Sequence, residues 1–168
     1  FNELFHALAN DIYRLAYGML GHREDAEDAT QEAFIRIYLS AKKYNGRGSA
    51  MRWIWRVCRN VIIDFMRQRQ QEVLLPPNEI AIAMDEAEWG AFNSEPTWIV
   101  REALHRLKPA DKEVLVMHYC VGKSVTDIAQ CLGISESGAK MRLLRARERF
   151  RALVQQIQNK TGGMDEEP

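Results

Sequence analysis

Apolar residues recur every three to four positions along the first 71 residues of this 168-residue chain, and nowhere in that stretch do they alternate with period two. A repeat near 3.6 places such residues on one face of an α-helix, whereas a half-buried strand needs alternation. The first such stripe contains Leu4, Leu8, Ile12, Leu15 and Met19. Because the same periodicity returns in the C-terminal half, we predict an all-α fold.

Breaks in this periodicity predict two small helical domains joined by a flexible linker. The segment between them contains Pro76-Pro77 and an excess of acidic residues, and its periodicity is weak. The expected units are an N-terminal helical bundle over 1–71, an acidic linker over 72–96, a C-terminal helix-turn-helix domain over 97–160 and a disordered tail over 161–168. Helices are expected at 2–20, 23–43, 49–71, 97–107, 110–121, 124–132 and 135–158.

The most specific local pattern lies in residues 124–135, where two short capping signals flank a glycine. Ser124 and Ser135 are the expected N-caps, and Gly133 makes the turn between the two helices. The second helix then carries six cations: Lys140, Arg142, Arg145, Arg147, Arg149 and Arg151. In a helix-turn-helix the start of the second helix enters the major groove, and flanking cations bind phosphates. The pattern predicts a reader of duplex DNA; the alternative is a plain corner of two helices with a solvated basic face.

A second basic segment carries two tryptophans. Trp53 and Trp55 lie among three arginines on the third expected helix, directly after the loop over 44–48. Aromatic faces beside guanidinium groups suit unstacked bases better than paired ones. Because side chains two residues apart on a helix point in different directions, we expect one tryptophan to pack inward and the other to face nucleic acid.

The formal net charge of zero conceals four segments of alternating sign. The net charge is −5 over residues 1–35, +8 over 36–69, −6 over 72–102 and +5 over 138–151. Local fields rather than totals govern the binding of polyanions. The two basic segments therefore favour two nucleic-acid surfaces, although either one alone could be a solvated helix face.

The sequence gives no support to several other classes of function. No run of 18 apolar residues could span a membrane and no signal peptide is recognisable, so we expect a cytoplasmic protein without membrane insertion. No nucleotide-binding glycine loop, zinc-protease motif or nucleophile elbow is present, so we expect no catalytic residues and no cofactor. Cys120 and Cys131 with His118 match no common zinc spacing, which favours core cysteines over a metal site.

The two halves together resemble one family. In the N-terminal half the resemblance is carried by Asp25–Phe34, Trp53–Asn60 and Asp64. In the C-terminal half it is carried by Leu107–Leu115, the helix-turn-helix and Arg145-Ala146-Arg147. These motifs, in this order, look like an extracytoplasmic-function sigma factor, a member of the sigma-70 family of bacterial RNA polymerase. The likeness covers about residues 1–71 and 97–153.

The resemblance implies three binding surfaces. The clamp of the polymerase β′ subunit would be bound by an acidic group on the second helix: Asp25, Asp28, Gln31 and Glu32. The −10 promoter element would be recognised and melted by a loop and the following helix: Asn45, Gly46, Arg47, Ser49, Arg52, Trp53, Arg56 and Asn60. The −35 element would be read by the last helix: Ser137, Lys140, Met141, Arg142, Leu144, Arg145, Arg147 and Arg149.

The resemblance also implies partners and a function. An alternative sigma factor directs promoter-specific initiation and would bind core RNA polymerase through the β′ clamp and the β flap, promoter DNA, and a membrane-anchored anti-sigma factor. A free chain is then expected to have two domains that move independently about 72–96. Ser137-Gly138-Ala139 departs from the frequent Gly-Thr-Val, Met141 replaces a frequent Ser, and Arg47 replaces a common acid. The alternative function is a helix-turn-helix regulator that binds DNA without being a polymerase subunit.

Overall fold

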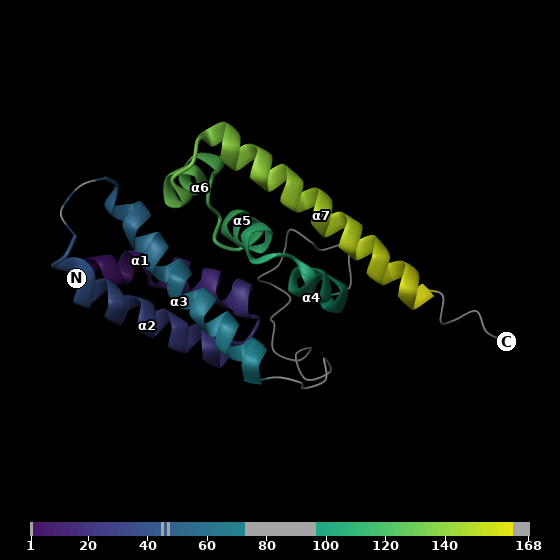
Figure 1. Ribbon diagram of the computed structural model, residues 1–168, viewed down its shortest axis with the longest axis horizontal. Coiled ribbons are helices and arrows are strands. Elements are labelled where there is room, and N and C mark those ends of the chain that lie inside the picture. Colours follow the sequence, from purple (N-terminus) through teal and green to yellow (C-terminus); the bar gives the residue numbers. More distant parts are fainter. Residues whose placement is uncertain (1, 45, 47, 73–96, 163–168) are drawn as a thin grey trace.

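The computed structural model describes residues 2–44, 46, 48–72 and 97–162, and every regular element in those ranges is an α-helix (Figure 1). The all-α prediction is therefore confirmed. Most of the expected linker, from residue 73 to 96, lies outside the described residues, as does the expected tail from residue 163 onwards. The candidate −10 residues Asn45 and Arg47 also lie outside them.

Three helices, α1 (Asn2–Leu20), α2 (Arg23–Ala41) and α3 (Ala50–Glu72), form an N-terminal bundle. Helix α2 packs along both α1 and α3. Their apolar faces meet in a core of large aliphatic and small side chains: Leu8, Ile12, Leu15, Ala26, Ala29, Ala33, Ile37, Val61 and Ile62. Ala26, Ala29 and Ala33 of α2 are fully buried, and their small side chains let the neighbouring helices approach closely.

The C-terminal half consists of α4 (Thr97–Arg106), α5 (Pro109–Tyr119), α6 (Val125–Leu132) and the long α7 (Glu136–Gly162). Helices α4, α5 and α6 all pack against α7. The observed bounds lie within about two residues of the expected ones, except at the end of α7. This helix continues past the expected end, and within its last turn the Thr161 hydroxyl donates to the carbonyl of Ile157 at 3.0 Å, so residues 161 and 162 are helical rather than part of a tail.

Local polar contacts define the turn between α6 and α7. The Ser124 hydroxyl accepts a hydrogen bond from the backbone N–H of Asp127 at 3.1 Å, and the Asp127 carboxylate accepts one from the Ser124 N–H at 3.1 Å. Gly133 follows α6 with φ of 66°, a left-handed conformation that glycine adopts without steric cost. The Ser135 hydroxyl then accepts from the N–H of Gly138 at 3.1 Å. Both expected caps and the expected turn are thus confirmed.

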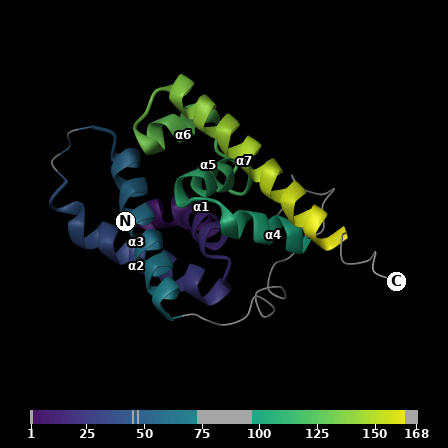
Figure 2. The same ribbon diagram turned by 45° about the vertical axis from the view of Figure 1, so that its right-hand side comes forward.

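The two halves pack against each other, which differs from the expectation of two domains that move independently. Helix α5 contacts α1, and α6 contacts α3, as the turned view in Figure 2 also shows for α1 and α5. One buried apolar cluster extends through both halves. Gly18 of α1 allows the approach, because a Cβ atom at this position would overlap the side chain of Val116 on α5. In this structure the halves therefore share a core.

Candidate nucleic-acid and protein interfaces

The acidic surface predicted on α2 lies at the outside of the bundle. Asp28 and Gln31 are exposed, whereas Asp25 and Glu32 are partly buried. Asp25 forms an ion pair with Arg69 of α3. The four residues do share one helix, but only two of them present their polar groups freely to a partner.

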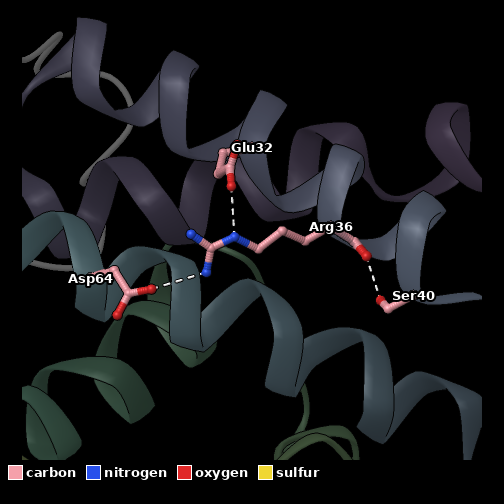
Figure 3. Close-up of polar contacts among 4 residues, drawn as sticks. All are labelled: Glu32, Arg36, Ser40 and Asp64. Atoms are coloured by element: carbon pink, nitrogen blue, oxygen red, sulfur yellow. Dashed lines mark hydrogen bonds and ion pairs between the residues drawn. The ribbon is translucent and has the colours of Figure 1, made fainter. Parts of the chain in front are cut away.

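Glu32 takes part in a polar network that links α2 to α3 (Figure 3). The Nε of Arg36 donates to Glu32 at 2.6 Å, and its Nη1 donates to Asp64 at 2.9 Å. The Ser40 hydroxyl donates to the backbone carbonyl of Arg36. These contacts raise the pKa of the Arg36 guanidinium, chiefly through the hydrogen bonds to Glu32 and then Asp64. Arg36 therefore holds the Glu32 carboxylate in place at the edge of the acidic surface.

Three large apolar side chains on α2 extend this surface and were not predicted as site residues. Ile35, Tyr38 and Leu39 are 53%, 62% and 67% exposed. They lie outside the buried face of α2, which is formed by Ala26, Ala29, Ala33, Phe34 and Ile37. A signal was present in the sequence, because Ile35, Tyr38 and Leu39 lie four, seven and eight positions after Gln31 and so share its face of the helix. Exposed apolar residues beside acids are typical of a protein-binding surface.

One stripe of α3 is polar and open to solvent. Arg52, Arg56 and Asn60 lie four residues apart along the helix and are all exposed, so they form a single row. Ser49 precedes α3, and its hydroxyl accepts from the backbone N–H of Arg52 at 3.4 Å. The structure therefore brings together three of the predicted −10 residues in a row that a single strand could follow.

An aromatic pair connects the start of the loop before α3 to α3 itself. The Tyr44 ring lies 5.2 Å from the Trp53 ring with an interplanar angle of 32°. The Tyr44 hydroxyl donates to the carbonyl of Gly48 at 2.7 Å, which fastens the described part of the loop. Trp53 is half-buried. Gly46 belongs to the same loop and is exposed.

The second tryptophan has a structural role, as expected for one of the two. Trp55 is only 3% exposed and faces the C-terminal half. The ammonium group of Lys123 lies 5.4 Å from the centre of its ring. One turn further along α3, Arg59 pairs with the buried Glu113 of α5 at 3.0 Å. This face of α3 is therefore covered by the other half of the chain.

The first turns of α7 form the second candidate nucleic-acid surface. Ala139, Leu143 and Ala146 face the core. The opposite face is exposed and contains five of the predicted −35 residues: Ser137, Lys140, Met141, Leu144 and Arg145. Met141 and Leu144 are 46% and 44% exposed, so the face combines apolar and cationic groups. Such a mixture suits the major groove, where thymine methyl groups and base acceptors lie side by side.

Three predicted −35 arginines also make contacts within the domain, and the Arg149 side chain does so while staying 56% exposed. Arg149 donates to both carboxylate oxygens of the buried Asp111, at 2.8 and 2.7 Å. Arg147 is half-buried and lies over the ring of Tyr119 at 5.4 Å. Arg142 is half-buried, and its charge acts on Glu113. All three side chains support the helix packing. Arg142 and Arg147 are therefore less available to phosphates than the sequence pattern indicates, whereas Arg149 remains exposed.

The three cysteines and the histidines form no cluster of metal ligands in the ranges that the structure describes. Cys58 and Cys131 are buried, and burial raises the pKa of their thiols to about 12 and about 11. The Nδ1 of His118 lies 2.9 Å from the carbonyl oxygen of Lys123. Within those ranges, too, no helix is both long and apolar enough to cross a membrane.

Comparison with known proteins shows that both halves match regions of the same protein family. Residues 4–72 match Sigma-70 region 2, and residues 97–150 match Sigma-70, region 4. The ECF RNA polymerase sigma factor SigM of Bacillus subtilis is 28% identical over 153 residues, which cover 90% of this chain and 93% of that protein. The RNA polymerase sigma factor SigZ of the same organism is 32% identical over 129 residues, covering 77% of this chain and 72% of SigZ.

Two solved structures share the fold. The sigma factor RpoE in complex with the anti-sigma factor NepR from Bartonella quintana has a TM-score of 0.66 at 21% identity, with 92% of this chain and 96% of that chain covered. CnrH in complex with the cytosolic domain of CnrY has a TM-score of 0.62 at 20% identity, with 92% and 86% covered.

Proposed function

The chain belongs to the extracytoplasmic-function sigma factors of the sigma-70 family, and from this we propose that it binds core RNA polymerase and directs promoter-specific initiation of transcription. One observation carries the proposal. The residues that match regions 2 and 4 each present one exposed face of cationic and polar side chains, on α3 and on α7. An alternative sigma factor needs two such faces, one for each promoter element.

We assign the −10 element to the row on α3 and the loop before it. Arg52, Arg56 and Asn60 would contact the separated strand, and Trp53 with its neighbour Tyr44 would offer a stacking surface to an extruded base. Unstacking a base costs a few kcal/mol, and stacking on an aromatic ring returns about 1–3 kcal/mol. Asn45, Gly46, Arg47 and Ser49 would complete this site. The domain boundaries follow as 1–71 for region 2 and 97–160 for region 4, with 72–96 as the linker.

We assign the −35 element to the exposed face of α7. Lys140, Met141, Leu144 and Arg145 would lie nearest the base edges, with Ser137 at the start of the helix. Arg142, Arg147 and Arg149 would add positive potential near the phosphates while holding their own contacts within the domain. Duplex reading by α7 and strand separation by α3 are therefore distinct tasks of the two halves.

We assign the polymerase β′ clamp to α2. Asp28 and Gln31 supply polar contacts, Asp25 and Glu32 supply negative charge, and the apolar residues Ile35, Tyr38 and Leu39 enlarge the buried area on binding. Region 4 would contact the β flap. As a polymerase subunit the protein has no reaction of its own, so we assign no catalytic residue, cofactor or metal, and it would act in the cytoplasm beside the chromosome.

We also propose regulation by an anti-sigma factor, anchored at the membrane. Of the two solved structures that share this fold, RpoE is in complex with the anti-sigma factor NepR, and CnrH is in complex with the cytosolic domain of CnrY. An inhibitor of this kind would cover the surfaces that polymerase needs.

The test is run-off transcription with purified core polymerase on a promoter library. Initiation should begin at promoters that share −10 and −35 sequences, and the double variant Asp28→Ala/Gln31→Ala should reduce both initiation and binding to core enzyme. Lys160→Ala, which changes an exposed cation at the far end of α7, is the matched control and should behave as the wild type. Absence of initiation above core polymerase alone would contradict the proposal. Sequence-specific DNA binding together with that absence would indicate the helix-turn-helix regulator instead.

A further inference from the structure

We propose that Arg36 is a positioning residue for polymerase binding: it holds the Glu32 carboxylate on the exposed face of α2 and anchors it to α3 through Asp64. Arg36 was not among the predicted site residues, and its charge is opposite to that of the acids around it. The inference rests on the proposed function, because it concerns how the polymerase-binding surface of α2 keeps its geometry.

The exposed stripe of α2 consists of Asp28, Glu32, Ile35 and Leu39. These residues follow one another at intervals of four, three and four positions, so they lie along one face of the helix. Ile35 and Leu39 are 53% and 67% exposed, and Asp28 is exposed as well. Glu32 thus lies between a second acid and two large apolar side chains. A partner that covers the apolar side chains must also remove water from the Glu32 carboxylate.

A carboxylate that loses water needs hydrogen bonds from the protein, because an unpaired buried charge is costly. The Nε of Arg36 donates to the Oε1 of Glu32 at 2.6 Å, which is the short distance of a charge-assisted bond. The pair is four residues apart with the acid first, the order that favours such contacts on a helix. The bond can therefore remain when the stripe is covered, and the carboxylate can still accept from a donor on the polymerase.

The other side of the guanidinium connects this pair to α3. The Nη1 of Arg36 donates to the Oδ2 of Asp64 at 2.9 Å (Figure 3). A guanidinium presents its N–H donors in a rigid plane, so bonds from two of its nitrogens determine its orientation. The Glu32 carboxylate is thus held by a side chain that is itself fixed to a second helix.

The three side chains together keep the surface negative. One cation is shared by two carboxylates, so the group of Glu32, Arg36 and Asp64 has a net charge of −1. Their side chains are 37%, 43% and 43% exposed. Exposed ion pairs add little to the stability of a fold. The arrangement is therefore better explained by the presentation of Glu32 to a partner than by stabilisation of the bundle.

A second acid of the surface is held in a comparable way. Asp25 lies two helical turns before Glu32 and forms an ion pair with Arg69 of α3. Asp25 and Glu32 are the two predicted polymerase-binding acids that are partly buried. Each is paired with an arginine, and both pairs lead to α3. The helix that carries the −10 row thus supports the polymerase-binding surface.

Positioning and simple electrostatics predict opposite effects of removing Arg36. In Arg36→Met the surface becomes more negative, so its long-range attraction for a cationic partner would increase. If Arg36 acts by positioning, the variant binds more weakly instead, because Glu32 must be ordered during binding. The cost of ordering one long side chain corresponds to a loss of affinity of about threefold to tenfold.

A double-mutant cycle with core polymerase tests the proposal. Fluorescence anisotropy of the labelled full chain would give the affinities of the wild type, Arg36→Met, Glu32→Gln and the double variant. Arg36→Met should bind about threefold to tenfold more weakly. The double variant should bind within about twofold of Glu32→Gln alone, because Arg36 acts only through Glu32. Unchanged or tighter binding of Arg36→Met would overturn the proposal, as would losses that multiply in the double variant.

Asp64→Asn tests the anchoring to α3. In the wild-type background it should weaken binding about twofold to fivefold, the range of an exposed ion pair. In the Arg36→Met background it should cause no further loss, because Asp64 acts through Arg36. Equal losses in both backgrounds, or no loss in either, would overturn the proposed anchoring.

Arg23→Met is the matched control. Arg23 also pairs with a glutamate four residues away on α2, at 2.9 Å. It lies five residues before Asp28 and therefore on a different face of the helix. This variant should bind core polymerase as the wild type does. Urea denaturation should show nearly equal stability for the wild type, Arg23→Met and Arg36→Met, since exposed pairs contribute little, and this separates a loss of binding from a loss of fold.

Failure of this inference is distinguishable from failure of the proposed function. If the wild type binds core polymerase and initiates in run-off transcription while Arg36→Met binds equally well, only the positioning role is overturned. If the wild-type chain binds no polymerase, the proposed function itself is contradicted.

Discussion

Arg149 of α7 donates to both carboxylate oxygens of Asp111 on α5, at 2.8 and 2.7 Å, and Asp111 is only 5% exposed. Arg149→Met would leave this carboxylate buried without its cation. We expect the free energy of unfolding to fall by about 2–4 kcal/mol, measured by urea denaturation followed by circular dichroism. Arg151→Met, an exposed neighbour on the same helix, should change it by less than about 0.5 kcal/mol. Equal effects of the two variants would show that the pair does not stabilise the fold.

Arg145, by contrast, is exposed on the reading face of α7. Arg145→Ala in the polymerase holoenzyme should cost about 1–3 kcal/mol of discrimination between the preferred −35 sequence and single-base variants. Competition binding with a set of −35 variants measures this difference. If affinity falls by the same factor for every sequence, Arg145 contacts a phosphate rather than a base.

Mutation of the two tryptophans of α3 should affect two different properties, promoter opening and protein stability. Trp53→Ala should destabilise the open complex by about 1–3 kcal/mol, because the stacking surface is lost. Permanganate reactivity of thymines in the −10 element measures the resulting fall in the fraction of open complex. Trp55→Ala should instead lower the free energy of unfolding by about 3–5 kcal/mol, because a 3% exposed indole is removed from the core. The assignment fails if Trp53→Ala proves to be the more destabilising of the two.

The lowered pKa of Lys112 predicts that the protein becomes more stable as the pH rises above 8. Burial lowers its pKa from the ordinary 10.5 to about 8. Above pH 8 the folded chain loses this proton while the unfolded chain keeps it, so the free energy of unfolding should rise between pH 8 and 10.5. The full gain is about 3 kcal/mol.

Urea denaturation at pH 7, 8.5 and 10 of the wild type and of Lys112→Met measures this gain. Other lysines and tyrosines titrate in the same range, so the quantity of interest is the difference between the two proteins. That difference should grow in favour of the wild type as the pH rises. A constant difference would show that Lys112 keeps its ordinary pKa in the folded state.

Local features of the sequence predicted the helices and their ends well. The positions of Ser124, Gly133 and Ser135 are readable because a cap or a left-handed turn depends on residues within one helical turn. The apolar stripes of the helices are similarly local. Burial of Cys58 and Cys131 follows from the same periodicity.

The exposure of the candidate site residues was predicted correctly on α3 but only in part on α7. The row of Arg52, Arg56 and Asn60 is exposed as expected. Arg147 and Arg149 of α7 make contacts within the domain only because Tyr119 and Asp111 lie beside them in the folded chain. Both pairs join residues more than 25 positions apart, and no periodic pattern marks such partners.

The sequence by itself determined that this chain is helical, where its helices begin and end, and that two cationic segments lie on separate halves, because those properties depend on neighbouring residues. Only the tertiary structure decided which of the two tryptophans is fully buried: it is Trp55, whereas Trp53 is half-buried. It also decided that Lys112 and Glu113 are buried against α1 and α3. The reason is that the free energy of a buried charge depends on a partner brought into contact by folding, and in these pairs that partner is distant along the chain.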